Sequence, residues 1–232
     1  MISAVILNYW PQRVGNIARI IKDLNSGTVK PDRIIVWNND PKSKIEAHLD
    51  NQICINSSHN FHCLVRYAVG LISESDHCLF IDDDLTVKRD TLEFLVKKSG
   101  IFPESILGFY GKDIGLDVNH PYTSGHDIKD VDIMRKVDIV LGRIHFCKRT
   151  KLANAFKLET EVDLLINRVV EEDIVLSMAN KIFEMESNYI FPNRVIELDE
   201  KGVGYHYTKN HYPRRDKSLK RILAWSRRMG YG

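Results

Sequence analysis

Short apolar runs alternate with amphipathic stretches along the N-terminal half of the chain. The apolar runs are rich in β-branched residues, as in parallel strands buried on both faces, and between them apolar residues recur at helical spacing. The sequence therefore predicts strands at residues 3–7, 33–37, 53–55 and 77–81, and helices at residues 14–25, 61–72 and 89–98. This alternation favours an α/β fold with a mostly parallel central sheet and helices on both faces.

The second half of the chain has a less regular pattern. Residues 106–110 and 137–141 are apolar enough to predict strands, and an apolar stripe over residues 175–183 predicts a helix. Residues 111–130 are rich in Gly, His, Asp and Pro and predict a long loop, which in a compact domain is often functional. No linker-like segment divides the chain, so we expect a single domain.

Polar residues follow three of the predicted strands at their carboxyl ends. Asn8 ends the first strand, Asn38 and Asn39 end the second, and Asp82–Asp84 ends the fourth. Ligands of open α/β sheets bind outside the carboxyl ends of the strands. We therefore expect these side chains to meet at one edge of the sheet.

The acidic triplet has the chemistry of a metal site. On an extended backbone residues i and i+2 face the same side, so Asp82 and Asp84 are expected to converge while Asp83 faces away. Carboxylate oxygens are hard ligands that suit Mg²⁺ or Mn²⁺. A solvated acidic turn is the alternative without a ligand.

Two other enzyme classes share parts of this pattern. Residues 82–86 also fit the D-x-D-x-T loop of haloacid-dehalogenase-type phosphatases, in which Asp82 would be the nucleophile. That motif normally follows the first strand of its domain, unlike here. A nucleotidylyltransferase would need a Gly-rich loop after the first strand, where this chain has only Gly15.

The charge of the chain is unevenly distributed. The formal net charge is +2, with 28% charged residues, and residues 214–232 alone carry +6. A basic tail on a mildly acidic body indicates a local anion contact and argues against a nucleic-acid partner. The seven basic residues of this segment are Arg214, Arg215, Lys217, Lys220, Arg221, Arg227 and Arg228.

Composition also bears on location. Hydrophobic residues make up 44% of the chain, yet no run approaches the roughly 20 residues of a membrane span, and the start lacks a signal-peptide pattern. The four cysteines have no metal-site or disulfide-scaffold spacing, so free thiols in a reducing compartment are expected. These features predict a cytoplasmic protein.

Four stretches match, in order, the motifs of a known family. They are the apolar strand at 4–9 with Arg13, the apolar-Trp-Asn-Asn strand end at 34–39, the acidic DxD motif at 80–84, and the Glu-Asp pair that opens residues 172–176. Weaker matches are 139–146 with 151–152, Asn60 with Arg66, and His211 with Arg214 and Arg215. With these motifs the chain resembles the exostosin-like glycosyltransferases of the GT-A fold from about residue 4 to 225.

The resemblance implies one GT-A (nucleotide-diphospho-sugar transferase) domain over residues 1–232. Its parts would be a nucleotide-binding half at 1–100, a donor and acceptor half at 101–213, and a basic C-terminal segment at 214–232. The activity implied is transfer of a sugar from a nucleoside diphosphate sugar, a UDP-sugar, to an acceptor hydroxyl with retention of configuration. Family members usually work in the secretory pathway behind a membrane anchor; this chain shows no such anchor, and a bacterial or viral relative fits better.

The resemblance also implies roles for individual residues. Asp84 and Asp82 would hold Mn²⁺ or Mg²⁺, with His206 a weaker candidate ligand. Asp173 would act on the acceptor side, although an acid at a helix start also stabilises the helix by its charge alone. Arg215 would pair with the leaving diphosphate. The implied nucleotide and donor contacts are Asn8, Arg13, Asn38, Asn39, Asn60, Arg66, Asp82, Asp83 and Arg214.

Some choices stay open at this level. The acceptor is a glycan or a lipid-linked sugar, and the residues do not distinguish them. A module of the same fold that binds nucleotide sugars without turnover is an alternative to an enzyme. The basic tail is interpreted as a cover over the active-site rim, or as a weak peripheral contact with an anionic membrane.

Overall fold

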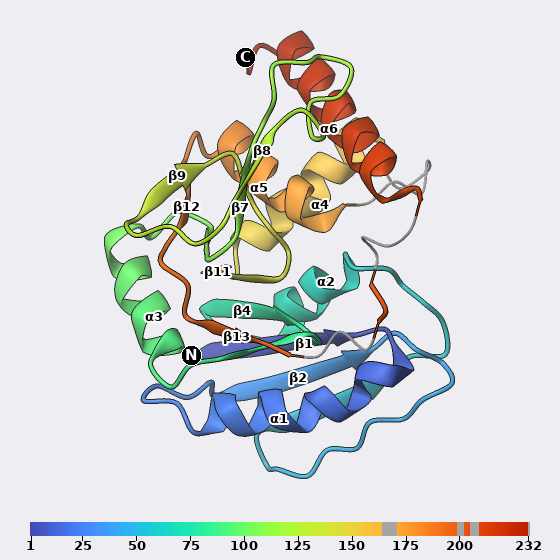
Figure 1. The fold of residues 1–232 in the computed structure, drawn as a ribbon, viewed down its shortest axis with the longest axis vertical. Helices are drawn as coiled ribbons and strands as arrows, with labels where there is room; N and C mark the ends of the chain where they lie inside the picture. Colours follow the sequence, from blue (N-terminus) through green and yellow to red (C-terminus); the bar gives the residue numbers. More distant parts are fainter. Residues whose placement is uncertain (164–170, 199–201, 205–208, 232) are drawn as a thin grey trace.

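The computed structural model describes residues 1–163, 171–198, 202–204 and 209–231, which fold around one large twisted sheet (Figure 1). The strand order of this sheet is β3-β2-β1-β4-β11-β6-β12-β9. Four of its seven described pairings are parallel. Its strands are β1 Ile2–Asn8, β2 Arg33–Asn38, β3 Gln52–Asn56, β4 His77–Asp82, β6 Leu107–Gly108, β9 Arg135–Val137, β11 Ile144–Lys148 and β12 Asn188–Ile190.

Helices cover both faces of the sheet, which confirms the predicted fold class. The described helices are η1 Pro11–Arg13, α1 Val14–Asn25, α2 Val65–Ile72, α3 Thr91–Ile101, α4 Lys151–Val162, α5 Glu172–Phe183 and α6 His211–Arg228.

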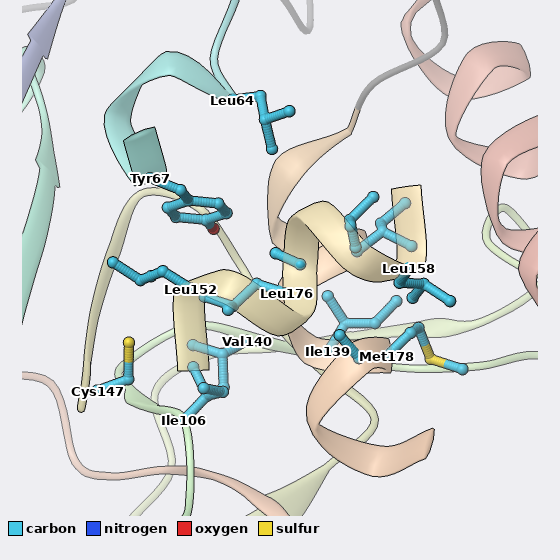
Figure 2. Packing of buried hydrophobic residues seen from close by; sticks show 14 of the residues in the cluster. Leu64, Tyr67, Ile106, Ile139, Val140, Cys147, Leu152, Leu158, Leu176 and Met178 are labelled. Carbon is cyan, nitrogen blue, oxygen red and sulfur yellow. The ribbon is translucent and has the colours of Figure 1, made fainter. Parts of the chain in front are cut away.

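Alternate side chains of β1 pack on opposite faces of the sheet. Ala4 and Ile6 pack with the apolar faces of α1 and α3, whereas Val5 packs in a second cluster with α2, α4, α5 and α6. Figure 2 shows part of this second cluster, in which Tyr67 of α2 and Leu152 of α4 come together. Burial of each large apolar side chain stabilises the fold by about 1.5–3 kcal/mol, so both helical layers are fixed to the sheet.

The second half departs from the predicted elements. Of the strand expected at 106–110 only β6 forms, and the stretch at 137–141 is divided between β9 and a strand of a different sheet, β10 (Ile139–Val140). Asp138 separates the two: its carboxylate accepts a hydrogen bond from the Ile114 backbone N–H at 2.8 Å and pairs with Lys181. These contacts of Asp138 therefore interrupt the single strand that the apolar residues at 137–141 predicted.

The predicted loop at 111–130 contains two short strands. These are β7 (Gly111–Asp113) and β8 (His126–Ile128), which form a three-stranded sheet with β10 in the order β10-β7-β8. The sequence pattern also gave no signal for α4 or β12. A separate pair, β5 (Leu85–Val87) with β13 (Val195–Glu197), follows directly after the acidic triplet.

The basic tail forms most of α6, which begins at His211 and ends at Arg228. Its apolar residues Leu219, Ile222 and Trp225 are buried against α4 and α5. Within the described residues, no helix has the length and apolar character that crossing a membrane requires.

Candidate functional site

The carboxyl ends of β1, β2 and β4 meet at one edge of the sheet, beside a pocket of about 610 Å³. The start of α5 and the first turns of α6 close its other side. The pocket is lined by nine of the predicted site residues: Arg13, Asn39, Arg66, Asp82, Asp83, Asp84, Asp173, Arg214 and Arg215.

The acidic triplet is arranged differently from the alternation expected for a strand. The Arg13 guanidinium donates to Asp83 at 2.8 Å and to Asp84 at 3.1 Å, so these two carboxylates share one cation. Asp82 instead pairs with Arg66 at 2.6 Å. The prediction that Asp83 faces away was wrong, because β4 ends at Asp82 and the next two residues form a turn.

Arg66 lies beneath the acidic edge and is almost completely buried. Besides Asp82, it donates to the Gly142 carbonyl at 2.9 Å and lies 3.9 Å from Glu172. Burial raises the pKa of Asp82 to about 6, an effect that Arg66 partly opposes. Arg66 therefore lets the partly buried Asp82 carboxylate remain ionised near neutral pH.

Asp173 is fixed by three donors at the N-terminus of α5. They are the backbone N–H of Gly142 at 3.0 Å, the backbone N–H of the next residue, Ile174, at 2.9 Å, and the Arg215 guanidinium at 2.5 Å. Burial opposes ionisation, but Arg215 and the two backbone donors hold the pKa of Asp173 below its usual value. Asp173 is therefore an ionised hydrogen-bond acceptor with little tendency to take up a proton.

Arg215 is the centre of a second ion-pair group. Its guanidinium also donates to Glu171 at 3.0 Å, and Arg214 lies 3.4 Å from the same carboxylate. The Tyr122 ring lies 4.4 Å from the Arg215 guanidinium carbon and 4.5 Å from the Lys112 ammonium. Tyr122, in the segment between β7 and β8, therefore contacts both Arg215 of α6 and Lys112 of β7.

Glu172 is a pocket residue for which the sequence indicated only the family motif. Burial raises its pKa to about 8, so its carboxyl is mostly protonated at neutral pH and can donate a hydrogen bond. Gly142 makes room for it, since a Cβ there would lie 3.0 Å from Glu172 Oε1. Arg143, also missed, lies 3.5 Å from Asp84 and pairs with Glu197.

The predicted asparagines divide into two groups. Asn39 lines the pocket, and its side chain binds Trp37 Nε1 and the backbone of 61–62. Asn8 and Asn38 are not among the pocket-lining residues, and their side chains bind elsewhere. Adjacent parallel strands place Asn8, Asn38 and Asn56 in register, so their amides bind one another at 2.8 and 3.1 Å.

The remaining predicted residues have different outcomes. Asn60 is not among the pocket-lining residues, and its side chain accepts the His62 backbone N–H at 2.8 Å, which shapes the turn beside the pocket. His206, a candidate metal ligand, lies outside the described residues. His211 lines the pocket at the start of α6.

The pocket lining has an excess of acid. Among the described residues it holds seven carboxyl groups and five guanidinium groups. With Glu172 protonated, six carboxylates face five guanidinium groups, so one negative charge is unmatched. No group of three or more His, Cys, Asp or Glu in the described part of the chain is already arranged around a metal position. The hard oxygen donors and the unmatched charge nevertheless suit a divalent cation. Asp84 has the longest arginine contacts of the triplet, and the Asp82 side chain is 29% exposed, so these two carboxylates are the most available to it.

Comparison with known proteins bears on the family and the fold. The family model described as "Glycosyl transferase family 64 domain" matches residues 2–231. A search of curated proteins finds no match. The fold is similar to that of S. aureus TarS 1–349 in complex with UDP-GlcNAc, with a TM-score of 0.58 and 11% identity over 92% of this chain. The match spans 64% of that TarS chain. TarS 1–349 without the ligand gives a TM-score of 0.49 and 13% identity over 83% of this chain and 58% of that one.

Proposed function

The chain belongs to the glycosyl transferase family 64 domain family and is a glycosyltransferase, and from this premise we propose that its pocket moves a sugar from a nucleoside diphosphate sugar to an acceptor hydroxyl. This assignment replaces the phosphatase interpretation of Asp82. One observation supports it above the others: Arg13, Arg66 and the acidic triplet line a single pocket at the carboxyl edge of β1 and β4. Ligands of open α/β sheets bind at that edge.

The chemistry of sugar transfer explains why so many charged groups surround this pocket. As the glycosidic bond breaks, negative charge develops on the leaving diphosphate and positive charge on the sugar ring. Catalysis then consists largely of stabilising both charges with groups that are already in place. The guanidinium groups and the buried acids that line the pocket have the required signs.

We assign the diphosphate side to arginines. Arg13 lies beside Asp83 and Asp84, and Arg214 and Arg215 reach the pocket from α6. A guanidinium binds phosphate oxygens in pairs, which suits a diphosphate better than an ammonium does. A divalent cation, Mn²⁺ or Mg²⁺, held by Asp84 and Asp82 would add Lewis-acid stabilisation of the leaving group.

We assign the sugar side to the start of α5. The ionised carboxylate of Asp173 orients the acceptor hydroxyl and stabilises positive charge on the sugar ring, since its lowered pKa makes it a poor proton acceptor. The mostly protonated Glu172 donates a hydrogen bond to a sugar hydroxyl beside Gly142. Arg215 holds Asp173 in place until the donor enters.

The finer assignments rest on the resemblance and on fold likeness. We propose an exostosin-like enzyme that uses a UDP-sugar through a DxD motif and retains the anomeric configuration. The UDP-GlcNAc bound to TarS supports a donor of this class, because the two folds are alike over most of this chain.

A thermal-shift screen of nucleotide sugars, each with Mn²⁺ and with EDTA, tests the proposal. A ligand that binds only the folded state raises the melting temperature by mass action, by several degrees at about 100 times its Kd. We expect a UDP-sugar with Mn²⁺ to give the largest shift, followed by its slow hydrolysis. Equal shifts with EDTA would contradict the metal assignment, and no shift with any nucleotide sugar would contradict the donor assignment.

A further inference from the structure

The outward face of α6 carries charge of a single sign over its whole length. Most solvent-facing residues of α6 lie within an arc of about 120°, and the apolar residues Leu219, Ile222 and Trp225 on its other side are buried against α4 and α5. Every charged residue on this arc is basic: Lys217, Lys220, Arg221, Arg227 and Arg228. We call this set the basic face of α6.

Folding alone does not account for this pattern. Lys217 lies one turn from both Lys220 and Arg221, and like charges at that spacing destabilise a helix. Other exposed helices of the molecule combine both signs, as in the Arg19–Asp23 pair of α1. Only Arg214 and Arg215 of the basic segment line the pocket, so the basic face does not act on the leaving diphosphate.

Exposed apolar side chains lie next to the basic face. Residues 116–120 form the tip of the connection between β7 and β8, and the Leu116 and Val118 side chains are 99% and 61% exposed. Lys220 of α6 donates to Asn119 in this tip at 3.1 Å. Figure 1 shows this connection running beside α6, at the opposite end of the molecule from α1. Asp117 is the one acidic residue of the tip.

The base of the tip is fixed to α6. The buried Asp216 carboxylate accepts the backbone N–H groups of Tyr122 and Thr123 at 2.8 and 2.9 Å. The tip and the basic face therefore form one rigid surface, which lies beside the pocket. Tyr212 lines both the pocket and a groove that leads between the tip and α6.

We propose that the basic face of α6 and the 116–120 tip dock the protein on an anionic phospholipid bilayer. Lysine and arginine side chains bind the anionic headgroups, and Leu116 and Val118 enter the boundary between headgroups and acyl chains. Docking on this side brings the pocket entrance at Tyr212 close to the bilayer. Resting on the proposed function, this assigns the acceptor to a sugar anchored in the membrane.

Vesicle co-sedimentation tests the docking surface. We expect binding to phosphatidylcholine vesicles that contain about 30% phosphatidylglycerol and little binding to pure phosphatidylcholine. Combined Lys217→Glu, Lys220→Glu and Arg227→Glu substitutions should weaken that binding by at least about tenfold. Leu116→Ser should weaken it about fivefold without a change of charge.

The matched control reverses three exposed lysines at the other end of the molecule: Lys22→Glu, Lys30→Glu and Lys42→Glu. It makes the same change in net charge and should retain binding within about twofold. Equal loss in both variants would overturn the proposal, as would wild-type binding to both kinds of vesicle alike.

A second readout separates this proposal from the proposed function. Hydrolysis of the donor in solution should be unchanged in the triple α6 variant, whose substituted side chains do not line the pocket. Vesicle binding without any donor binding would refute the glycosyltransferase chemistry and leave the docking surface intact. Donor hydrolysis without vesicle binding would refute the docking surface alone.

Discussion

Replacing Arg215 with methionine removes the cation that joins α6 to the start of α5. Arg215 lies 2.5 Å from Asp173 and 3.0 Å from Glu171, and all three side chains are less than 10% exposed. Methionine keeps most of the apolar volume but leaves the Asp173 carboxylate buried without its cation, while Glu171 keeps Arg214 at 3.4 Å. Removing one partner from a buried ion pair costs about 3–5 kcal/mol.

In a chain of this size that loss lowers the melting temperature by roughly 10 °C. Urea unfolding followed by tryptophan fluorescence at neutral pH measures the free energy directly. Arg227→Met, on the exposed side of the same helix, is the control and should change it by less than about 0.5 kcal/mol. Adding Asp173→Asn to Arg215→Met should recover part of the loss, since the buried charge is then gone.

The pH dependence gives an independent check. Arg215 holds the pKa of Asp173 below its usual value, so the stabilisation is present above the ordinary carboxyl pKa and is lost as the pH falls through the lowered one. In the variant the same carboxylate takes up a proton more easily. The gap in stability between wild type and Arg215→Met should therefore narrow as the pH falls from 7 toward 4. A loss below about 1 kcal/mol, or a gap that stays constant with pH, would refute this account.

Two further predictions concern single carboxyl groups. Glu159 of α4 is fully buried with no hydrogen-bond partner among the described residues, and burial raises its pKa to about 7. The free energy of unfolding of the wild type should thus fall as the pH rises from about 4.5 to 7. Glu159→Gln should lose this pH dependence and be more stable than the wild type by up to about 3 kcal/mol at pH 8, measured by urea unfolding at several pH values. The same pH dependence of stability in both proteins would contradict this prediction. Asp173→Asn should retain donor binding in calorimetry and reduce the rate of sugar transfer at least about 100-fold. Asp50 is an exposed acid, and the control Asp50→Asn should change neither quantity. Full transfer activity in Asp173→Asn would leave Asp173 only its role at the helix start.

Local sequence signals predicted the N-terminal half of the fold well. The apolar runs of β1, β2 and β4 are buried on both faces, so their pattern does not depend on distant partners. The acidic triplet also lies at the expected edge. Elements whose boundaries depend on contacts with distant residues were not predicted. Asp138, for example, separates β9 from β10 where its carboxylate binds the Ile114 backbone N–H and Lys181.

The sequence predicted most of the residues that line the pocket, but it did not predict which of them form ion pairs with one another. Arg13 and Asp83 are 70 positions apart, and strand periodicity cannot show that one guanidinium joins Asp83 to Asp84. The same limit explains Asn8 and Asn38, whose amides satisfy each other because two parallel strands end in register.

Calorimetric titration of UDP into the protein, with Mn²⁺ and with EDTA, tests the central claim most directly. We predict that wild type binds UDP in Mn²⁺ and at least about tenfold more weakly in EDTA. Asp84→Ala should bind equally weakly in both, because the carboxylate most available to the ion is gone. Unchanged Mn²⁺-dependent affinity in Asp84→Ala, or wild-type affinity that EDTA does not alter, would contradict a metal-assisted nucleotide-sugar site at this edge of the sheet.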